Sequence, residues 1–169
     1  MNTRYLTVIG IAMIAILISF SACVNPRKGY APEQPIKFSH ALHSGENQIP
    51  CRYCHVMPGA GPHSSVPGVN TCMNCHALVK TQSPEIKKVR KAWESGEPIK
   101  WVKVHDLPDH ARFSHQPHIA FGFDCSECHG QVNRMEVVAT QNEFNMGWCV
   151  DCHRDPEHNA SVDCVTCHY

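Results

Sequence analysis

The sequence predicts a small fold that is mostly irregular, with short α-helices. The chain has 169 residues, of which 12 are Pro and 10 are Gly, so long regular elements have little room. At this length a core made of side chains alone would be thin. The chain also has 11 Cys and 13 His, far more than an average globular protein. We therefore expect something other than side chains to fill the interior.

The charge of the chain is balanced, with 15 basic and 15 acidic side chains. A neutral chain of this kind does not suggest nucleic acid or any other strongly charged partner. The overall composition therefore excludes no other class of function, and the chemistry has to be identified from the arrangement of Cys and His.

The N-terminal segment, residues 1–23, has the features of a membrane-directed signal. Arg4 precedes an uncharged, mostly apolar run of 18 residues, close to the lower limit for crossing a bilayer. The positive charge predicts that the rest of the chain lies on the periplasmic (outer) face of a bacterial cytoplasmic membrane. The run ends in Phe20-Ser21-Ala22-Cys23, which resembles a bacterial lipobox with Phe in place of the usual Leu. We expect this segment to anchor the chain, through a lipid on Cys23 or as a retained transmembrane helix.

The remainder divides into a linker and one domain. Residues 24–34 are rich in Pro, Gly and charged side chains, which is typical of a linker. Residues 35–169 contain all the repeated motifs described next, and we expect them to form a single domain.

Five CxxCH motifs use ten of the eleven cysteines. Two thiols at this spacing can each form a thioether to one vinyl group of the same porphyrin, and the His that follows then lies under the iron as its proximal ligand. Zinc sites and disulfides also use paired cysteines, but neither explains a His after every second Cys. We predict five covalently attached haem c groups and a multihaem cytochrome c fold wrapped around them. The predicted attachment residues are Cys51, Cys54, Cys72, Cys75, Cys125, Cys128, Cys149, Cys152, Cys164 and Cys167, and the predicted proximal ligands are His55, His76, His129, His153 and His168.

Two stretches of the domain repeat the same order of motifs. An FSHxxH motif precedes the first CxxCH by seven residues, and another precedes the third CxxCH by six. A further CxxCH follows in each stretch, so the repeat predicts two dihaem modules, about 31–76 and 108–153, and one extra haem at 164–168. Each module has two haem motifs and the two histidines of one FSHxxH motif. These FSHxxH histidines are therefore predicted as distal ligands: His40, His43, His115 and His118.

The distal ligand of the extra haem is left open by the residues alone. His105 is favoured because it lies in a short apolar stretch and should be partly buried. His63 lies in a Pro/Gly-rich loop and His158 in a polar turn, where exposure is expected, and His110 is a further candidate. Met146, three residues before Cys149, is the plausible sulfur ligand and would raise the potential of its haem.

One longer helix is predicted between Ser83, as its N-cap, and Gly96, which can end it. Its apolar side chains at 86, 89 and 93 share one face. The basic side chains at 87, 88, 90 and 91 predict a solvated face or a docking face for an acidic partner. Residues 99–104 could form a short extended segment.

An iron with His on both sides has no open position for a substrate, which predicts electron carriers and not an enzyme. Three functions remain: an electron-transfer subunit of a membrane quinol oxidoreductase, a multihaem reductase with one five-coordinate haem, and a free-standing electron shuttle. Eight spare histidines for five irons argue against the reductase, and the predicted anchor argues against the shuttle.

The segment from Gln34 to Pro156 resembles the pentahaem cytochrome c subunit of alternative complex III, a class III-like multihaem cytochrome. The matching motifs are PIKFSHALHSGE at 35–46, CRYCH at 51–55, TCMNCH at 71–76, VHDLPD at 104–109 and MGWCVDCH at 146–153. A similar subunit of the quinone reductase complex of sulfate reducers has six haems and the opposite electron flow, so five CxxCH motifs favour the first family.

The resemblance implies bis-His haems, with His105 as the fifth distal ligand because it lies in the matched VHDLPD stretch. It also implies partners: an iron–sulfur, molybdopterin-oxidoreductase-like subunit, a quinol-binding membrane subunit, and a downstream monohaem cytochrome or terminal oxidase.

Overall fold

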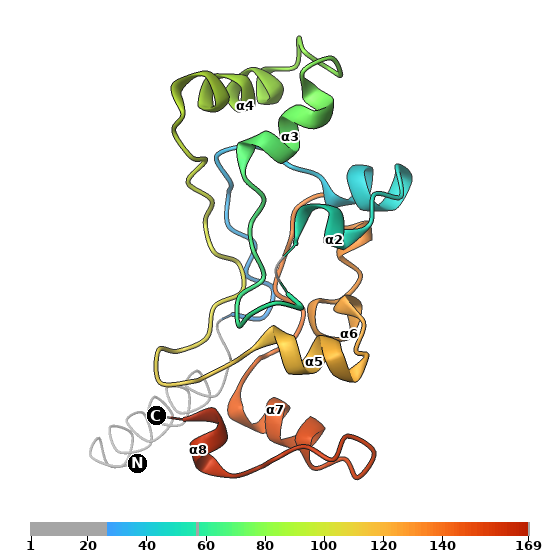
Figure 1. The fold of residues 1–169 in the computed structure, drawn as a ribbon, viewed down its shortest axis with the longest axis vertical. Helices are drawn as coiled ribbons and strands as arrows, with labels where there is room; N and C mark the ends of the chain where they lie inside the picture. Colours follow the sequence, from blue (N-terminus) through green and yellow to red (C-terminus); the bar gives the residue numbers. More distant parts are fainter. Residues whose placement is uncertain (1–26, 57, 169) are drawn as a thin grey trace, which may run out of the picture.

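The computed structural model describes residues 27–56 and 58–168. Within these ranges the chain forms short helices joined by irregular segments and contains no β-strand (Figure 1). An isolated antiparallel bridge joins Ala111 to His168. The predicted fold class, small and mostly irregular with short helices, is therefore confirmed. The predicted extended segment at 99–104 is part of an irregular connection.

The elements follow one another along the chain with little regular structure between them. In order they are a π-helical turn η1 (Ala41–Glu46), α2 (Cys51–Cys54), α3 (Val69–His76), α4 (Pro84–Ser95), α5 (His115–Phe121), α6 (Cys125–His129), a 3-10 turn η2 (Val132–Arg134), α7 (Met146–His153) and α8 (Cys164–Cys167). The five helices α2, α3, α6, α7 and α8 each carry one CxxCH motif.

Helix α4 matches its predicted bounds. Ser83 is the N-cap with extended backbone angles, Pro84 is the first helical residue, and Gly96 ends the helix in the left-handed region at φ 71°. The Ser83 hydroxyl makes no capping bond, so its contribution is limited to its backbone carbonyl, which accepts from the Lys87 N–H at 2.9 Å. Trp93 does not share the burial of Val89, because half of its surface is exposed.

Very little apolar surface is buried in the described part of the chain. Ile36 and Val89, at 6% and 4% exposure, are its buried hydrophobic residues. They lie where the 35–37 segment crosses α4: Lys37 N–H donates to the Glu85 carboxylate at 2.8 Å, and Lys88 Nζ donates to the Pro35 carbonyl at 3.3 Å. So small a core does not offset the conformational entropy of a chain this long, which supports the expectation that bound groups complete the interior.

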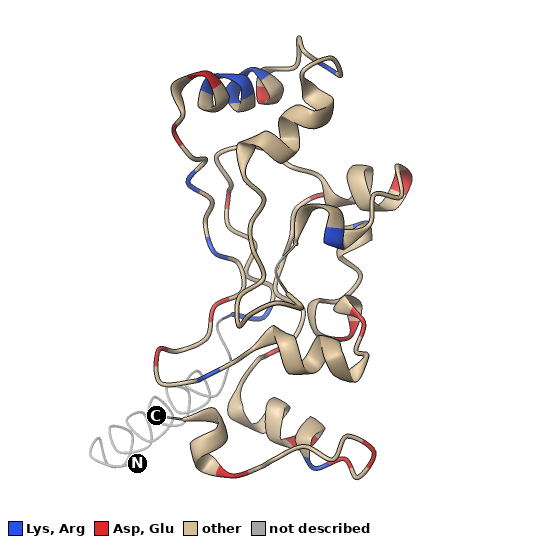
Figure 2. Ribbon diagram, in the orientation of Figure 1, with Lys and Arg blue, Asp and Glu red and all other residues tan. Residues whose placement is uncertain are grey.

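The basic side chains gather on α4, at one end of the elongated molecule (Figure 2). Lys88 forms an ion pair with Glu85 at 2.9 Å, and Arg90 Nη2 donates to the Ala77 carbonyl at 3.5 Å. The face is therefore partly engaged with the protein itself, while Lys87 and Lys91 are exposed.

The predicted anchor, residues 1–23 with Cys23, lies outside the described residues, and it stays a prediction. Between residues 27 and 168, Met57 excepted, no helix has the length and apolar character needed to cross a bilayer. The described part of the predicted linker, residues 27–34, is held to the domain: Gly29 N–H donates to the Thr140 carbonyl at 2.7 Å, and Thr140 N–H donates to the Tyr30 carbonyl at 3.0 Å.

Candidate haem sites

Each CxxC pair lies on one helical turn, so its two thiols face the same side of the helix. Helix α6 begins with a capping box, in which Asp124 accepts from the Ser126 N–H at 2.8 Å and Glu127 accepts from the Asp124 N–H at 2.9 Å. Asn145 caps α7 by accepting from the Trp148 N–H at 2.8 Å. None of the ten CxxC cysteines is in a disulfide. The geometry is the one that two thioether bonds to one porphyrin require.

Pairs of imidazole rings face each other across gaps that an iron would fill. An iron bound by imidazole on both sides, with metal–nitrogen bonds of about 2 Å, separates the two ring centroids by about 6 Å. Three CxxCH histidines have a second imidazole at this separation. The centroid distances are 6.1 Å for His76 with His43, 6.2 Å for His129 with His115 and 6.0 Å for His153 with His118. The rings of His168 and His110 are 5.7 Å apart, but His168 donates from Nδ1 to the His110 carbonyl at 3.1 Å, so His110 lies on the side of the ring away from Nε2.

The remaining CxxCH histidine, His55 of the first motif, is close to His40. Burial and, to a smaller extent, the charges of His55 and His43 together lower the pKa of His40 to about 4. The Nδ1 atom of His40 is buried and has no hydrogen-bond partner among the described residues. A neutral imidazole is the form that binds a metal, so His40 fits the role of distal ligand to the haem of His55.

The second ring nitrogen of most of these histidines donates to a backbone carbonyl. Because a carbonyl can only accept, Nδ1 carries the proton and Nε2 keeps its lone pair for the iron. The acceptors for the CxxCH histidines are Ser65 for His55 (2.7 Å), Val79 for His76 (3.0 Å), Ser161 for His153 (2.8 Å) and His110 for His168 (3.1 Å). The acceptors for the spare histidines are Ser39 for His43 (2.8 Å), Pro62 for His115 (3.0 Å) and Ser114 for His118 (2.7 Å).

The Phe of each FSHxxH motif holds both histidines of that motif. Phe38 lies edge-on to His40 at 4.8 Å and stacks on His43 at 4.3 Å. Phe113 lies edge-on to His115 at 4.8 Å and against His118 at 4.8 Å. Sequence reasoning identified the histidines but missed this role of the Phe, although its repetition in both motifs was the available signal.

Neighbouring thiols show the order of the sites in space. Burial raises the pKa of Cys72, and nearby Cys54 raises it further. For three other thiols, burial raises the pKa most, and the next largest rise comes from a cysteine of another motif. That cysteine is Cys51 for Cys125, Cys152 for Cys128 and Cys167 for Cys149. The sites therefore adjoin one another in the order α3, α2, α6, α7 and α8, and these helices follow one another along the molecule in Figure 1. The second CxxCH of the chain is at one end of this line and the fifth is at the other.

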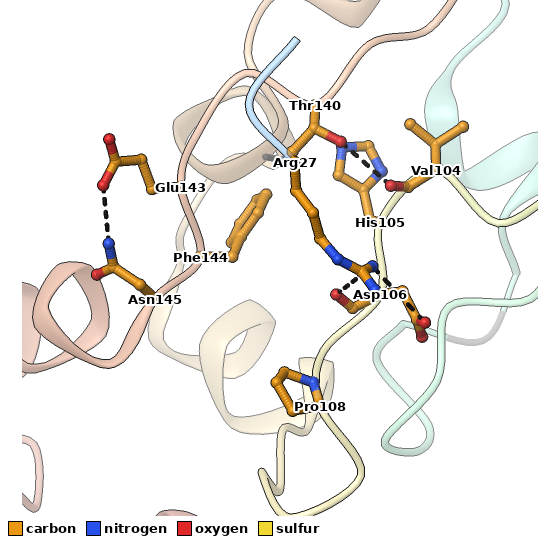
Figure 3. A pocket seen from close by; sticks show the side chains of 9 residues that line it. All are labelled: Arg27, Val104, His105, Asp106, Pro108, Thr140, Glu143, Phe144 and Asn145. Atoms are coloured by element: carbon orange, nitrogen blue, oxygen red, sulfur yellow. Dashed lines mark hydrogen bonds and ion pairs between the residues drawn. The ribbon is translucent and has the colours of Figure 1, made fainter. Parts of the chain in front are cut away.

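His105 lies beside a CxxCH histidine without room for a metal between them. Its ring centroid is 4.5 Å from that of His129 at an interplanar angle of 81°, and Phe144 lies 5.7 Å away. The His105 and Phe144 rings border a cavity of about 220 Å³ that Arg27 and Thr140 also line (Figure 3). The structure thus brings His105 next to His129, and it brings the His110 carbonyl against Nδ1 of His168, on the side of that ring away from an iron.

The other candidates for the extra haem lie elsewhere. His63 is exposed. His158 is half-buried, where exposure was expected, because its Nδ1 donates to the Cys152 carbonyl at 2.7 Å. Met146 opens α7 with 69% of its surface exposed. No group of three or more His, Cys, Asp or Glu side chains within the described ranges could hold a conventional metal ion, whereas a haem iron needs only two protein ligands.

Comparisons with known proteins agree with this chemistry. The family model described as "Class III cytochrome C family" matches residues 20–107, and the model described as "Cytochrome c7 and related cytochrome c" matches residues 111–169. A protein of Nitratidesulfovibrio vulgaris named "Menaquinone reductase, multiheme cytochrome c subunit" is 29% identical over 161 residues, covering 80% of this chain and 77% of its own length. The two family models together span the CxxCH motifs, and the first alone covers more than half of the sequence. The chain belongs to the class III cytochrome c family and is a multihaem cytochrome c with covalently bound haem.

Proposed function

We propose that this cytochrome carries five haems and relays electrons in a membrane-associated, quinol-oxidising respiratory complex. The observation that carries the proposal is the pairing of imidazoles, because three CxxCH histidines have a second imidazole at the separation that an iron between the two rings requires. When bound, an iron with two imidazole ligands takes up and returns one electron and leaves no position for a substrate. The proposed axial pairs are His40–His55, His43–His76, His115–His129 and His118–His153, and His105 stays the proposed distal ligand of the haem at His168.

The protein's part is to hold these ligands and to order the attachment sites. The backbone carbonyls against Nδ1 fix the ring orientation and the tautomer of seven of the ten histidines. The adjacency of the CxxC thiols supports one continuous path between Cys72/Cys75 and Cys164/Cys167. Partners would therefore exchange electrons with the two ends of the line. The basic face of α4, beside α3, would suit an acidic partner at the first end.

The kind of complex rests on the resemblance of the matched motifs to alternative complex III. The relative named as a subunit of a menaquinone reductase supports quinone-linked chemistry more broadly. We propose as partners an iron–sulfur, molybdopterin-oxidoreductase-like subunit, a quinol-binding membrane subunit, and a downstream monohaem cytochrome or terminal oxidase. The proposed location is the periplasmic face of the membrane, with residues 1–23 as the anchor.

Purification of the native protein from membranes in mild detergent tests this proposal. We expect five haems per chain by the pyridine haemochrome assay, comigration with iron–sulfur and membrane subunits, and reduction of the haems by added menaquinol. A chain that always migrates alone would favour a free-standing shuttle. Substantial CO binding by the reduced native protein would favour a reductase with a five-coordinate haem.

A further inference from the structure

The loop that follows α3 connects an exposed surface to the haem site at one end of the line. His76 donates from Nδ1 to the Val79 carbonyl at 3.0 Å, so the loop at 77–80 lies on the side of this ring away from Nε2 and from an iron. Leu78 has 90% of its surface exposed and Val79 has 51%. Apolar side chains in solvent, one hydrogen bond away from a proposed haem ligand, are the first sign of a docking surface.

Helix α4 lies beside this loop and extends the exposed surface. Arg90 Nη2 donates to the Ala77 carbonyl at 3.5 Å, which joins α4 to the loop. Trp93 is three residues further along α4, on the same side of the helix as Arg90, and about half of its surface is exposed. Partly exposed Trp and Arg side chains are the types that most often anchor a protein interface. We call the loop at 77–80 and the adjoining side of α4 the α3–α4 surface.

The α3–α4 surface is positively charged. Residues 77–95 contain five basic and two acidic side chains, and one of the acids, Glu85, is paired with Lys88 at 2.9 Å. Three further lysines of this segment are exposed: Lys80, Lys87 and Lys91. Lys87 and Lys91 are four residues apart on α4, so they project from the same face. Exposed apolar side chains beside several cations fit a partner that presents carboxylates.

The other end of the line of haem sites has the opposite charge. Residues 146–168, which include α7 and α8, contain four acidic side chains and one basic one. Figure 2 shows acidic side chains on the connection after α7, at the end of the molecule opposite α4. The chain is neutral as a whole, but its charges differ between the two ends. An acidic protein is therefore attracted to the α3–α4 surface and repelled by the α7–α8 end.

We infer that the α3–α4 surface docks an acidic redox protein, which exchanges single electrons with the haem attached at Cys72 and Cys75. The inference rests on the proposed function, because it requires a haem at this end of the line. In the exchange the ferrous haem gives one electron to the oxidised centre of the partner and becomes ferric, or the reverse, and no bond or proton is transferred. The partner covers Leu78 and Trp93 and places its carboxylates against the lysines.

The test mixes the full-length, haem-loaded, reduced protein with oxidised plastocyanin, an acidic copper protein that accepts one electron. Stopped-flow absorbance measures the second-order rate constant at low and at high salt. Lys87→Glu combined with Lys91→Glu should lower the rate constant at low salt by about tenfold or more. The difference should vanish at high salt, because dissolved ions screen the charges. Lys28→Glu combined with Arg154→Glu makes the same change in net charge at exposed positions outside this surface and is the matched control.

Two further measurements locate the contact. Leu78→Ser should lower the rate constant at low and high salt alike, because an apolar contact is not screened by ions. Carbodiimide, which joins lysines to carboxylates, should cross-link plastocyanin to the peptides that contain Lys80, Lys87 or Lys91, as read by mass spectrometry. A haem count and a redox titration should be unchanged in every variant, which shows that the haem sites are intact.

Equal rate constants in the charge-reversed pair and its control, or cross-links confined to other lysines, would overturn the inference. A second copy of this chain, presenting its acidic α7–α8 end, is the competing occupant. Sedimentation of the protein alone tests it: salt-sensitive oligomers that disappear in Lys87→Glu with Lys91→Glu would assign the surface to self-association and overturn the acidic partner. If the unaltered protein lacked its haems, the proposed function would fail, which is a separate outcome.

Discussion

The two segments that share the order FSHxxH, CxxCH, CxxCH support their haem sites in different ways. At the second site of each segment the support is the same: His43 donates to the Ser39 carbonyl at 2.8 Å, and His118 donates to the Ser114 carbonyl at 2.7 Å. Both bonds span four residues within the motif itself. The motif therefore supports this ligand by local geometry, and the ligand is reproduced wherever the motif occurs.

The first site of each segment depends on distant residues, and the two copies use different ones. In the first segment the CxxCH histidine, His55, has a local carbonyl at Ser65, while distal His40 has no acceptor. In the second segment the pattern is reversed. Distal His115 has an acceptor, Pro62, that comes from the first segment, and His129 packs against His105. The motif specifies the ligands of this site, and the neighbouring chain decides how they are supported.

The spacers differ by one residue, and the local helix type differs with them. Seven residues separate His43 from Cys51, and the chain there forms the π-helical turn η1. Six residues separate His118 from Cys125, and there the chain forms the α-helix α5, which ends at Gly122 with φ 111°. A π turn accommodates one extra residue in a helical path, so it keeps both histidines in place despite the longer spacer.

The largest expected effect comes from removing an attachment site in the middle of the line. Cys125→Ser with Cys128→Ser should leave four haems and interrupt the path between its two ends, because this site adjoins those of α2 and α7. The paired change Cys164→Ser with Cys167→Ser should also leave four haems, but with the remaining path intact. Rapid-mixing reduction kinetics resolved haem by haem would distinguish them, and equal kinetics in the two variants would contradict the linear order.

The shared second site predicts equal effects in the two segments. His43→Met and His118→Met should each raise the potential of one haem by on the order of 0.1 V, within the roughly 0.8 V that axial ligands span, without loss of any attachment. Potentiometric titration with a haem count checks this. A shift in one variant and none in the other would show that the two copies are not equivalent even at this site.

The cap of α6 is a stabilising device that α8 lacks. Asp124→Ala removes the capping box and should cost about 1 kcal/mol in the free energy of unfolding. Asp163→Ala is the matched control, since that side chain caps no backbone N–H and should change stability much less. Denaturant titrations of the haem-loaded variants measure both, and equal losses would argue against a role for the cap.

The same cap predicts a pH dependence. The hydrogen bonds from Ser126 lower the pKa of Asp124, so the folded pKa lies below the unfolded value near 4. Its contribution is present above the unfolded pKa and is lost as the pH falls through the folded one. Unfolding measured between about pH 5 and pH 2 should therefore converge for the wild type and Asp124→Ala at the acid end.

The smallest effect is expected on α4, which has no counterpart in the second segment. Lys88→Met removes the exposed ion pair with Glu85 and should cost less than about 0.5 kcal/mol. Glu85→Ala should cost more, because it removes the acceptor of both Lys88 and the Lys37 N–H at 2.8 Å, whereas Lys88→Met removes, besides the ion pair, only the longer bond to the Pro35 carbonyl at 3.3 Å. Thermal melts of the two variants rank them, and a reversed order would show that the junction with residues 35–37 contributes little.

The local part of this protein could be predicted from the sequence. The CxxCH spacing predicted the five thiol pairs, Ser83 and Gly96 predicted the bounds of α4, and the repeat singled out His43 and His118. All of these depend on contacts within one or two helical turns, where spacing determines which side chains share a face. The sequence did not predict which thiol pairs are neighbours or in which order the haem sites follow one another along the molecule.

Only the tertiary structure decided which histidines, far apart in the sequence, lie next to each other in space. His110 and His168 are 58 residues apart and meet through a backbone bridge, and nothing in either local sequence specifies the other. His105, favoured from its apolar surroundings, is partly buried as expected but lies against His129. The fold has few regular elements and a small core. Irregular connections held by individual hydrogen bonds, such as those from Thr140 and Arg27, therefore determine which histidines lie together. Hydrophobic periodicity carries no information about such connections, because it reports only which face of a regular element is buried.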